Sequence, residues 1–241
     1  MAREVSVKSQ NQNRESTPIQ ALIFDMDGLL VDSETVAGEA LRLFLHGHGH
    51  EMRPNTIEGA LGMRLPEAVA LVAEAYGLPG PVDELTAAYD AMRLQALHGN
   101  VLAMPGAVAV LDWAAARGVP RALATSSFRG HADVSLVEAA LAGRFDVEVT
   151  GDEVLHGKPA PDLFLLAADR LGVSPESCVV FEDAPAGLEA AVRAGMRVVW
   201  VPNSHTRRLT ARTPVAARLE SLSDAVGWLA SQEVGAAPPE S

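Results

Sequence analysis

The chain has few of the features that mark a secreted or membrane protein. Its 241 residues include one cysteine, Cys178, so no internal disulfide can form, and we expect a buried thiol in a reducing compartment. No apolar stretch reaches the roughly 18 residues that a membrane-spanning helix needs. The first 17 residues are polar and contain no apolar segment of a targeting signal. We therefore expect a cytoplasmic protein with no membrane partner.

Basic and aromatic residues are also scarce. There are 19 lysines and arginines against 31 acidic residues, and the formal net charge is -12. This balance argues against nucleic acid as a partner, because phosphate backbones are bound by basic surfaces. Hydrophobic residues, in contrast, make up 48% of the chain. This share is enough for a substantial core in one large domain or two small ones.

Short apolar runs alternate with longer helical patterns along most of the chain. The predicted strands are Gln20–Phe24, Arg121–Thr125, Val147–Thr150, Cys178–Phe181 and Arg197–Val201. The predicted helices among them are Ala107–Arg117, His131–Ala142, Pro161–Leu171 and Ala186–Ala194. Apolar strands separated by helices indicate a parallel sheet covered on both faces. The predicted fold class is therefore α/β, with a Rossmann-like, doubly wound parallel sheet as its core.

One region departs from this alternation. Residues 34–99 contain three helical patterns, at Glu34–His46, Pro66–Ala75 and Glu84–Leu97, and no convincing strand. We predict an all-helical cap over residues 34–99, inserted into an α/β core made of residues 18–33 and 100–232. Residues 1–17 and 233–241 are expected to be a flexible extension and a flexible tail. Ligands bind beyond the carboxyl ends of parallel strands, so the cap would lie over the site as a lid.

Two aspartates follow the first predicted strand. Side chains alternate along a strand, so Asp25 and Asp27 can face the same side, and Gly28 then allows a sharp turn. Two crowded carboxylates cost electrostatic energy unless a cation or a shared proton relieves them. The arrangement is typical of metal-assisted phosphoryl transfer, although Asp-x-Asp-Gly alone would also fit an ordinary turn.

Three more polar motifs follow in the second half of the chain. Thr125-Ser126-Ser127 offers hydroxyl and backbone N–H donors to phosphate oxygens, or a plain helix cap. Lys158 could neutralise the charge of a phosphate and a nucleophile, or be a solvated lysine. Glu182 and Asp183 end the fourth predicted strand, and Mg²⁺ prefers such oxygen ligands. Four motifs in this order indicate one phosphoryl-transfer site.

Together these motifs resemble the haloacid dehalogenase superfamily, in the branch with a helical cap after the first motif. The resemblance covers roughly residues 19–205. It rests on Asp-Met-Asp-Gly-Leu-Leu-Val-Asp-Ser-Glu at 25–34, Met-Pro-Gly-Ala at 104–107, Ala-Leu-Ala-Thr-Ser-Ser at 122–127, His-Gly-Lys-Pro-Ala-Pro-Asp at 156–162 and Phe-Glu-Asp-Ala-Pro-Ala-Gly at 181–187. The later motifs are most similar to the branch that includes pseudouridine-5'-phosphatases, glycerol-phosphate phosphatases and β-phosphoglucomutase-like enzymes.

The resemblance implies catalytic roles for several residues. Asp25 would be the nucleophile that forms an aspartyl-phosphate, and Asp27 the general acid and base. Thr125 would hydrogen-bond the transferring phosphoryl group, Lys158 would compensate its negative charge, and Ser126 is a candidate for binding substrate.

The resemblance also implies a Mg²⁺ cofactor. The ion would be held by Asp25, the backbone carbonyl of Asp27 and Asp183, with Glu182 beside it. Carboxylate and phosphate repel each other, so attack on phosphorus needs such neutralisation.

The cap gives weaker signals. Residues 61–65 occupy the place of a substrate-specificity loop in the resembling family, so Arg64 is a candidate to bind substrate, although a solvated arginine fits equally well. His46, His48 and His50 alternate with glycine at a helix end, a pattern without fixed geometry that does not favour a metal site.

We predict a Mg²⁺-dependent phosphatase that acts on a small phosphorylated metabolite, the monoester of a sugar, polyol or nucleoside. A sugar phosphomutase is one alternative, but related mutases carry a histidine on the first cap helix where this chain has Ala37. A non-catalytic sugar-phosphate-binding protein is another, and it would be expected to have a broken motif, which this chain does not have. We expect a monomer or a weak dimer.

Overall fold

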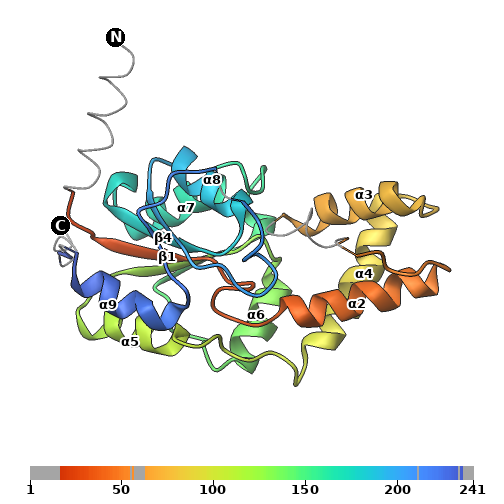
Figure 1. The fold of residues 1–241 in the computed structure, drawn as a ribbon, viewed down its shortest axis with the longest axis horizontal. Coiled ribbons are helices and arrows are strands. Elements are labelled where there is room, and N and C mark those ends of the chain that lie inside the picture. Colours follow the sequence, from red (N-terminus) through yellow and green to blue (C-terminus); the bar gives the residue numbers. More distant parts are fainter. Residues whose placement is uncertain (1–16, 55, 57–62, 211, 233, 236–241) are drawn as a thin grey trace, which may run out of the picture.

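Residues 17–54, 56, 63–210, 212–232 and 234–235 are described by the computed structural model. They form two bodies that lie side by side along the long axis of the molecule (Figure 1). One is a sheet with helices on both faces, and the other consists of three helices.

The sheet has six strands within the described residues, in the order β3-β2-β1-β4-β5-β6, and every neighbouring pair is parallel. The strands are β1 (Ala21–Phe24), β2 (Arg121–Ala124), β3 (Val147–Val149), β4 (Cys178–Glu182), β5 (Arg197–Trp200) and β6 (Ala217–Arg218). The central strand β1 pairs with β2 on one side and β4 on the other. The carboxyl ends of all strands therefore meet at one edge, as the predicted doubly wound α/β fold requires, and that fold class is confirmed.

The helices of this core are α5 (Ala107–Ala116), α6 (Arg129–Glu138), α7 (Asp162–Leu171), α8 (Pro185–Arg193) and α9 (Ala225–Ala230). Side chains alternate along each strand, so each face of the sheet receives every second residue. Leu22 and Phe24 pack with residues of α5, α6 and α9, whereas Ala21 and Ile23 pack with residues of α7 and α8. Both faces of β1 are buried, which explains why its sequence shows no polar alternation.

The second body consists of α2 (Glu34–Gly47), α3 (Leu65–Tyr76) and α4 (Val82–Leu97). It has an apolar core of its own, which includes Phe44, Val69 and Tyr89. Helix α4 contacts both α2 and α3 and also contacts α6 of the sheet body. We call this body the cap; its exact boundaries at residues 34 and 99 stay a prediction. The predicted extension and tail lie almost entirely outside the described residues.

The predicted elements differ from the observed ones mainly near the carboxyl end of the chain. Strand β6 and helix α9 were not predicted, because two edge residues and a six-residue helix carry little periodic signal. The helix predicted to end at Ala142 ends at Glu138 as α6, since Ala140 adopts a φ of 55°, which lies outside the helical region.

Cys178 lies on β4 and is fully buried, as expected for a structural thiol. Burial raises the pKa of this thiol to about 12, so it stays protonated at neutral pH.

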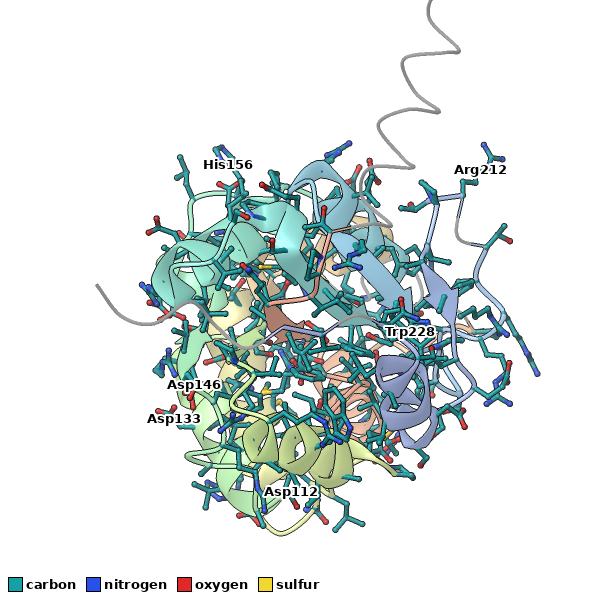
Figure 2. All side chains as sticks on the ribbon, turned by 90° about the vertical axis from the view of Figure 1, so that its left-hand side faces the viewer. Asp112, Asp133, Asp146, His156, Arg212 and Trp228 are labelled. Carbon is teal, nitrogen blue, oxygen red and sulfur yellow. The ribbon has the colours of Figure 1, made fainter. Side chains whose placement is uncertain are left out.

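The surface of the sheet body carries exposed charged pairs. Figure 2 shows Asp112 and Asp133 at the surface; Asp112 pairs with Arg144 at 2.6 Å and Asp133 with Arg129 at 3.6 Å. Such exposed pairs contribute little to stability, so burial of apolar groups must supply most of it. Within the described residues, no helix combines the length and apolarity needed to cross a membrane.

Substitution of Phe181 by alanine should test this core. The Phe181 ring is fully buried, stacks on Phe24 at a centroid distance of 5.1 Å and meets the edge of Trp228 at 6.1 Å. We expect Phe181→Ala to lower the free energy of unfolding by about 3–5 kcal/mol in urea titrations, because it leaves a cavity between the two rings. Leu43→Ala, at a half-exposed cap position, is the control and should change it by under about 1 kcal/mol. Equal losses in the two variants would contradict this view of the core.

Candidate active site

Polar side chains gather where the central strands end. Asp25 directly follows β1, Thr125 directly follows β2, and Glu182 and Asp183 stand at the end of β4. Because these strands are parallel neighbours, their ends bring the three segments together at one edge of the sheet. The structure thus places residues far apart in the sequence in one site.

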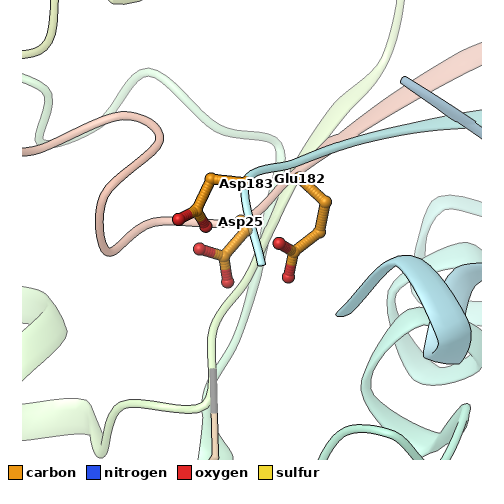
Figure 3. Close-up of side chains that lie close together, drawn as sticks. All are labelled: Asp25, Glu182 and Asp183. Carbon is orange, nitrogen blue, oxygen red and sulfur yellow. The ribbon is translucent and has the colours of Figure 1, made fainter. Parts of the chain in front are cut away.

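Three of these residues form a buried carboxylate cluster. Asp25, Glu182 and Asp183 offer oxygens that all lie within 4.8 Å of one another, and Figure 3 shows the three side chains converging. Burial raises the pKa of Asp25 and of Asp183 well above the ordinary range, and the negative charge of Glu182 raises both further. Such a cluster favours a bound cation, and oxygen donors at this spacing suit a hard divalent ion.

Lys158 supplies positive charge beside the cluster. Its side chain is fully buried, and Nζ donates hydrogen bonds to Asp25 Oδ1 at 2.5 Å and to Glu182 Oε1 at 2.8 Å. Burial alone would lower the pKa of Lys158, but these two carboxylates raise it above its usual value. The lysine therefore keeps its charge at neutral pH and pairs with two of the three carboxylates.

The start of α8 fixes the position of Glu182. The backbone N–H of Ala184 donates to Glu182 Oε2 at 2.7 Å. A Cβ atom on Gly187 would come within 1.6 Å of Glu182 Oε1, so only glycine leaves room for the carboxylate there. This contact gives a physical reason for glycine in the Ala-Pro-Ala-Gly segment.

Asp27 is held by hydroxyl groups rather than by a cation. Ser33 Oγ donates to its Oδ1 at 2.5 Å, while Ser127 Oγ and Thr125 Oγ1 donate to its Oδ2 at 2.7 and 3.2 Å. A hydroxyl can donate or accept a hydrogen bond. The same three groups can therefore hold Asp27 in its ionised or its protonated form. Ser33 was not among the site residues predicted from the sequence, and Ser127 was expected to bind phosphate oxygens as part of the Thr125-Ser126-Ser127 motif rather than to hold Asp27.

Asn203 is a further site residue that was not predicted from the sequence. Its Nδ2 donates to Asp183 Oδ2 at 2.9 Å and to Glu34 Oε2 at 2.8 Å, as well as to the backbone of Gly28. Its Oδ1 accepts from the backbone N–H groups of residues 205 and 206. Asn203 lies three residues beyond β5, so its position as a polar residue after the last predicted strand was the signal that could have revealed it.

Glu34 was predicted only to begin the first cap helix, but it also lies in the site. It shares Asn203 with Asp183 and lines the same pocket as Asp25 and Asp27. Burial raises the pKa of Glu34 to about 8; the hydrogen bond from Asn203 opposes this shift, and the charge of Asp27 adds to it. Glu34 therefore holds a proton at pH 7 in the metal-free protein.

The two residues predicted to bind substrate have different surroundings. Ser126 lines the pocket beside Asp25. Arg64 donates through Nη1 to the carbonyl of Val154 at 3.0 Å and through Nη2 to Glu67 at 2.5 Å. Arg64 thus links the cap to the sheet body and is not among the described residues that line the pocket. Substrate binding by Ser126 and by Arg64 stays a prediction.

The cap histidines pack against aromatic rings. The His48 ring lies 4.5 Å from that of Phe44, and its Nδ1 is 2.8 Å from the Phe44 carbonyl oxygen. The His50 ring meets Tyr76 edge-on at 5.6 Å. These contacts give two of the three histidines a structural role at the end of α2.

Removal of Lys158 should expose the cost of the buried carboxylates. In Lys158→Met, Asp25 and Glu182 would lose their cation while staying buried. We expect the free energy of unfolding at pH 7 to fall by about 3–5 kcal/mol in urea titrations. Arg42→Met removes an exposed cation paired with Glu39 and should cost about 1 kcal/mol or less. If Lys158→Met lowers the free energy of unfolding no more than Arg42→Met does, Lys158 is not needed to offset the charge of the buried carboxylates.

Glu34 should make the stability of the metal-free protein depend on pH. The unfolded chain releases the Glu34 proton near the ordinary pKa of 4.5, whereas the folded protein holds it to about 8. The stability contributed by this proton is present below pH 4.5 and is lost as pH rises toward 8. Glu34→Gln should therefore flatten the fall in unfolding free energy between pH 5 and about 8, measured in EDTA by urea titration. Glu74→Gln, at an exposed cap position, is the control. An unchanged slope in Glu34→Gln would contradict the assignment.

Comparison with known proteins finds relatives that are named as phosphatases. The chain is 36% identical over 197 residues to a probable pseudouridine-5'-phosphatase of Drosophila melanogaster, covering 79% of this chain and 85% of that protein. It is 38% identical over 184 residues to a fructose-1-phosphate phosphatase of Escherichia coli, covering 75% and 95% of the two chains. Both relatives carry phosphatase names and are matched over most of their length.

Solved structures show the same fold. The structure of CbbY from Rhodobacter sphaeroides in complex with phosphate superposes with a TM-score of 0.77 at 26% identity, covering 86% of this chain and 96% of that one. The family model described as haloacid dehalogenase-like hydrolase matches residues 19–195. This match spans most of the chain, including every strand end that carries the carboxylate cluster. The chain therefore belongs to the haloacid dehalogenase-like hydrolase family.

Proposed function

We propose that this protein is a Mg²⁺-dependent phosphatase that hydrolyses a small phosphate monoester through an aspartyl-phosphate on Asp25. The observation that carries the proposal is the contact between the buried Asp25 and Lys158 within the carboxylate cluster. Asp27 follows Asp25 by two residues and lines the same pocket. The phosphatase names of the relatives support the same reaction.

Asp25 is the proposed nucleophile because it is oriented and opens onto the pocket. Lys158 holds Oδ1, which leaves Oδ2 to attack phosphorus. The P–O bond to the leaving alcohol breaks as the bond to Oδ2 forms. The positive charge of Lys158 offsets part of the repulsion between the carboxylate and the incoming phosphate. Ser126, which lines the pocket, is proposed to donate to a phosphate oxygen.

Asp27 is the proposed proton carrier. It lines the pocket and is held by the hydroxyls of Ser33, Thr125 and Ser127. It would protonate the leaving alcohol oxygen and then accept a proton from the water that attacks the aspartyl-phosphate. The hydroxyls can reverse their hydrogen bonds when Asp27 changes protonation, so no side chain has to move between the two steps.

The carboxylate cluster fits the cofactor that this reaction needs. Asp25, Asp183 and the backbone carbonyl of Asp27 would hold Mg²⁺, with Glu182 beside it. The ion would neutralise charge on the transferring phosphoryl group. Asn203 Nδ2 and the Trp200 indole N–H, which donates to the Asp183 backbone carbonyl at 2.9 Å, keep Asp183 in position for this role.

The pocket favours hydrolysis over phosphomutase chemistry. At the position where related mutases carry a histidine, Ala37 lines the pocket, so this position provides no titratable group. A non-catalytic binding protein would not need the buried pairing of Asp25 with Lys158, which costs desolvation of both charges.

Phosphate release tests the proposal directly. With Mg²⁺ and a panel of sugar, polyol and nucleoside monophosphates, the wild-type protein should release phosphate from at least one compound. EDTA should abolish release, and Asp25→Asn should lower kcat by about 10³-fold or more, because the amide is a poor nucleophile. Asp112→Asn, which changes an exposed aspartate in the sheet body, should retain wild-type turnover. Full activity of Asp25→Asn, or activity in EDTA, would contradict the proposed mechanism.

A further inference from the structure

The pocket above Asp25 has two unlike sides. The sheet body contributes acids and hydroxyls, among them Asp25 and Ser126, whereas the cap contributes mostly apolar side chains such as Leu41, Phe44 and Val69. These apolar walls cannot hydrogen-bond the hydroxyl groups of a leaving alcohol. A polar or charged group on that alcohol therefore needs a particular partner within the cap.

Arg93 on α4 is such a partner. Its side chain lines the pocket, and within the described residues it forms no hydrogen bond and no ion pair. The other arginines of the cap are all engaged: Arg42 with Glu39, Arg53 with the Ala75 carbonyl, and Arg64 with Glu67 and Val154. The Nε atom of Arg93 is buried without a hydrogen-bond partner. A buried N–H group without an acceptor costs free energy, which an anion bound in the pocket would compensate.

Among the described residues, no carboxylate lies within ion-pair distance of Arg93. Asp90, one helical turn earlier, has Oδ1 at 2.7 Å from His131 Nε2 of α6. Tyr89 uses its hydroxyl to donate to the Ala37 carbonyl at 3.0 Å, and its ring centre lies 5.8 Å from the Arg93 guanidinium. The Tyr89 ring thus supports the guanidinium on one side without neutralising its charge.

Arg93 lines the same pocket as the reacting carboxylates but does not pair with them. No ion pair within 4.0 Å joins it to Asp25 or Asp27 in the described part of the chain. The transferring phosphate would lie against Asp25, so the unpaired guanidinium is available for a different group of the same substrate.

We propose that Arg93 binds a second anionic group, a carboxylate or a second phosphate, on the leaving alcohol of the substrate. The planar fork of a guanidinium matches the oxygens of either group. The apolar walls from α2 and α3 then pack on the carbon chain that joins this group to the transferring phosphate. The inference rests on the proposed phosphatase function and narrows its substrate class to phosphate monoesters that carry a second anion.

Matched pairs of substrates test Arg93 in the Mg²⁺-loaded enzyme. One pair is 3-phosphoglycerate and glycerol 3-phosphate, which differ in a carboxylate; the other is fructose 1,6-bisphosphate and fructose 1-phosphate, which differ in a phosphate. The wild-type enzyme should prefer the more anionic member of at least one pair by about tenfold in kcat/KM. The pair that shows the preference identifies the anion.

Arg93→Met should abolish this preference, mainly through a rise of about tenfold in KM for the anionic member with a smaller change in kcat. Arg93→Lys should retain part of it, because charge remains but the fork is lost. Arg42→Met, an exposed cap arginine, should keep it in full. If Arg93→Met does not fold, Arg93→Gln takes its place. No preference in the wild type, or an unchanged preference without Arg93, would overturn the proposal.

Binding separates this inference from the proposed reaction. If the wild type releases phosphate from no compound, the proposed function fails, and the same four compounds are titrated into Asp25→Asn by calorimetry. Tighter binding of an anionic member that weakens by about tenfold in the Asp25→Asn, Arg93→Met double variant would still support Arg93 as the anion site. Equal binding of the paired compounds, or no binding, would overturn it.

Discussion

The site depends on an imbalance of buried charge. Asp25, Glu182 and Asp183 are buried together at the ends of two adjacent strands, and among the described residues Lys158 is the buried lysine or arginine that faces them. Desolvation and mutual repulsion raise the free energy of the ionised carboxylates, so the metal-free site favours whatever brings positive charge. In the proposed reaction this demand is met by a divalent cation. The same imbalance explains why neighbouring parts of the chain supply so many fixed donors, including the amide of Asn203 and the backbone N–H of Ala184.

The cap gives the site its second property, a mostly apolar wall facing an acidic floor. Helices α2, α3 and α4 bury their own core, and α4 also packs on α6 of the sheet body, so the pocket lies between two independently packed units. Apolar walls exclude water and strengthen the electrostatic interactions below them. Against this background Arg93 and Glu34 are the basic and the acidic side chain that the cap adds to the pocket lining. One meets the leaving group in our proposal, and the other borders the carboxylate cluster through Asn203.

Much of this arrangement could be predicted from local sequence because parallel strands place their carboxyl ends at one edge. The apolar run before Asp25 and the one before Glu182 were both recognisable as buried strands, and parallel pairing brings the polar residues at their ends together. Asn203 was missed because it comes after β5 and a short loop with no known motif. Arg93 was missed for a different reason: one arginine in an amphipathic helix has no signal until the fold shows which face lines the pocket. Strand β6 pairs with two residues of β5 only, too few for any periodic pattern.

The central claim is that phosphate passes through a covalent bond to Asp25, and trapping that bond is its most direct test. Replacement of Asp27 by asparagine should slow hydrolysis of the aspartyl-phosphate, because no base then activates water, while a substrate with a good leaving group such as p-nitrophenyl phosphate can still react. Acid quenching within the first turnover, followed by peptide mass spectrometry, should find one phosphoryl group on the peptide that contains Asp25, labile to hydroxylamine. The account would be contradicted if the wild type releases phosphate but the Asp27→Asn variant carries its phosphoryl group on another residue or on none.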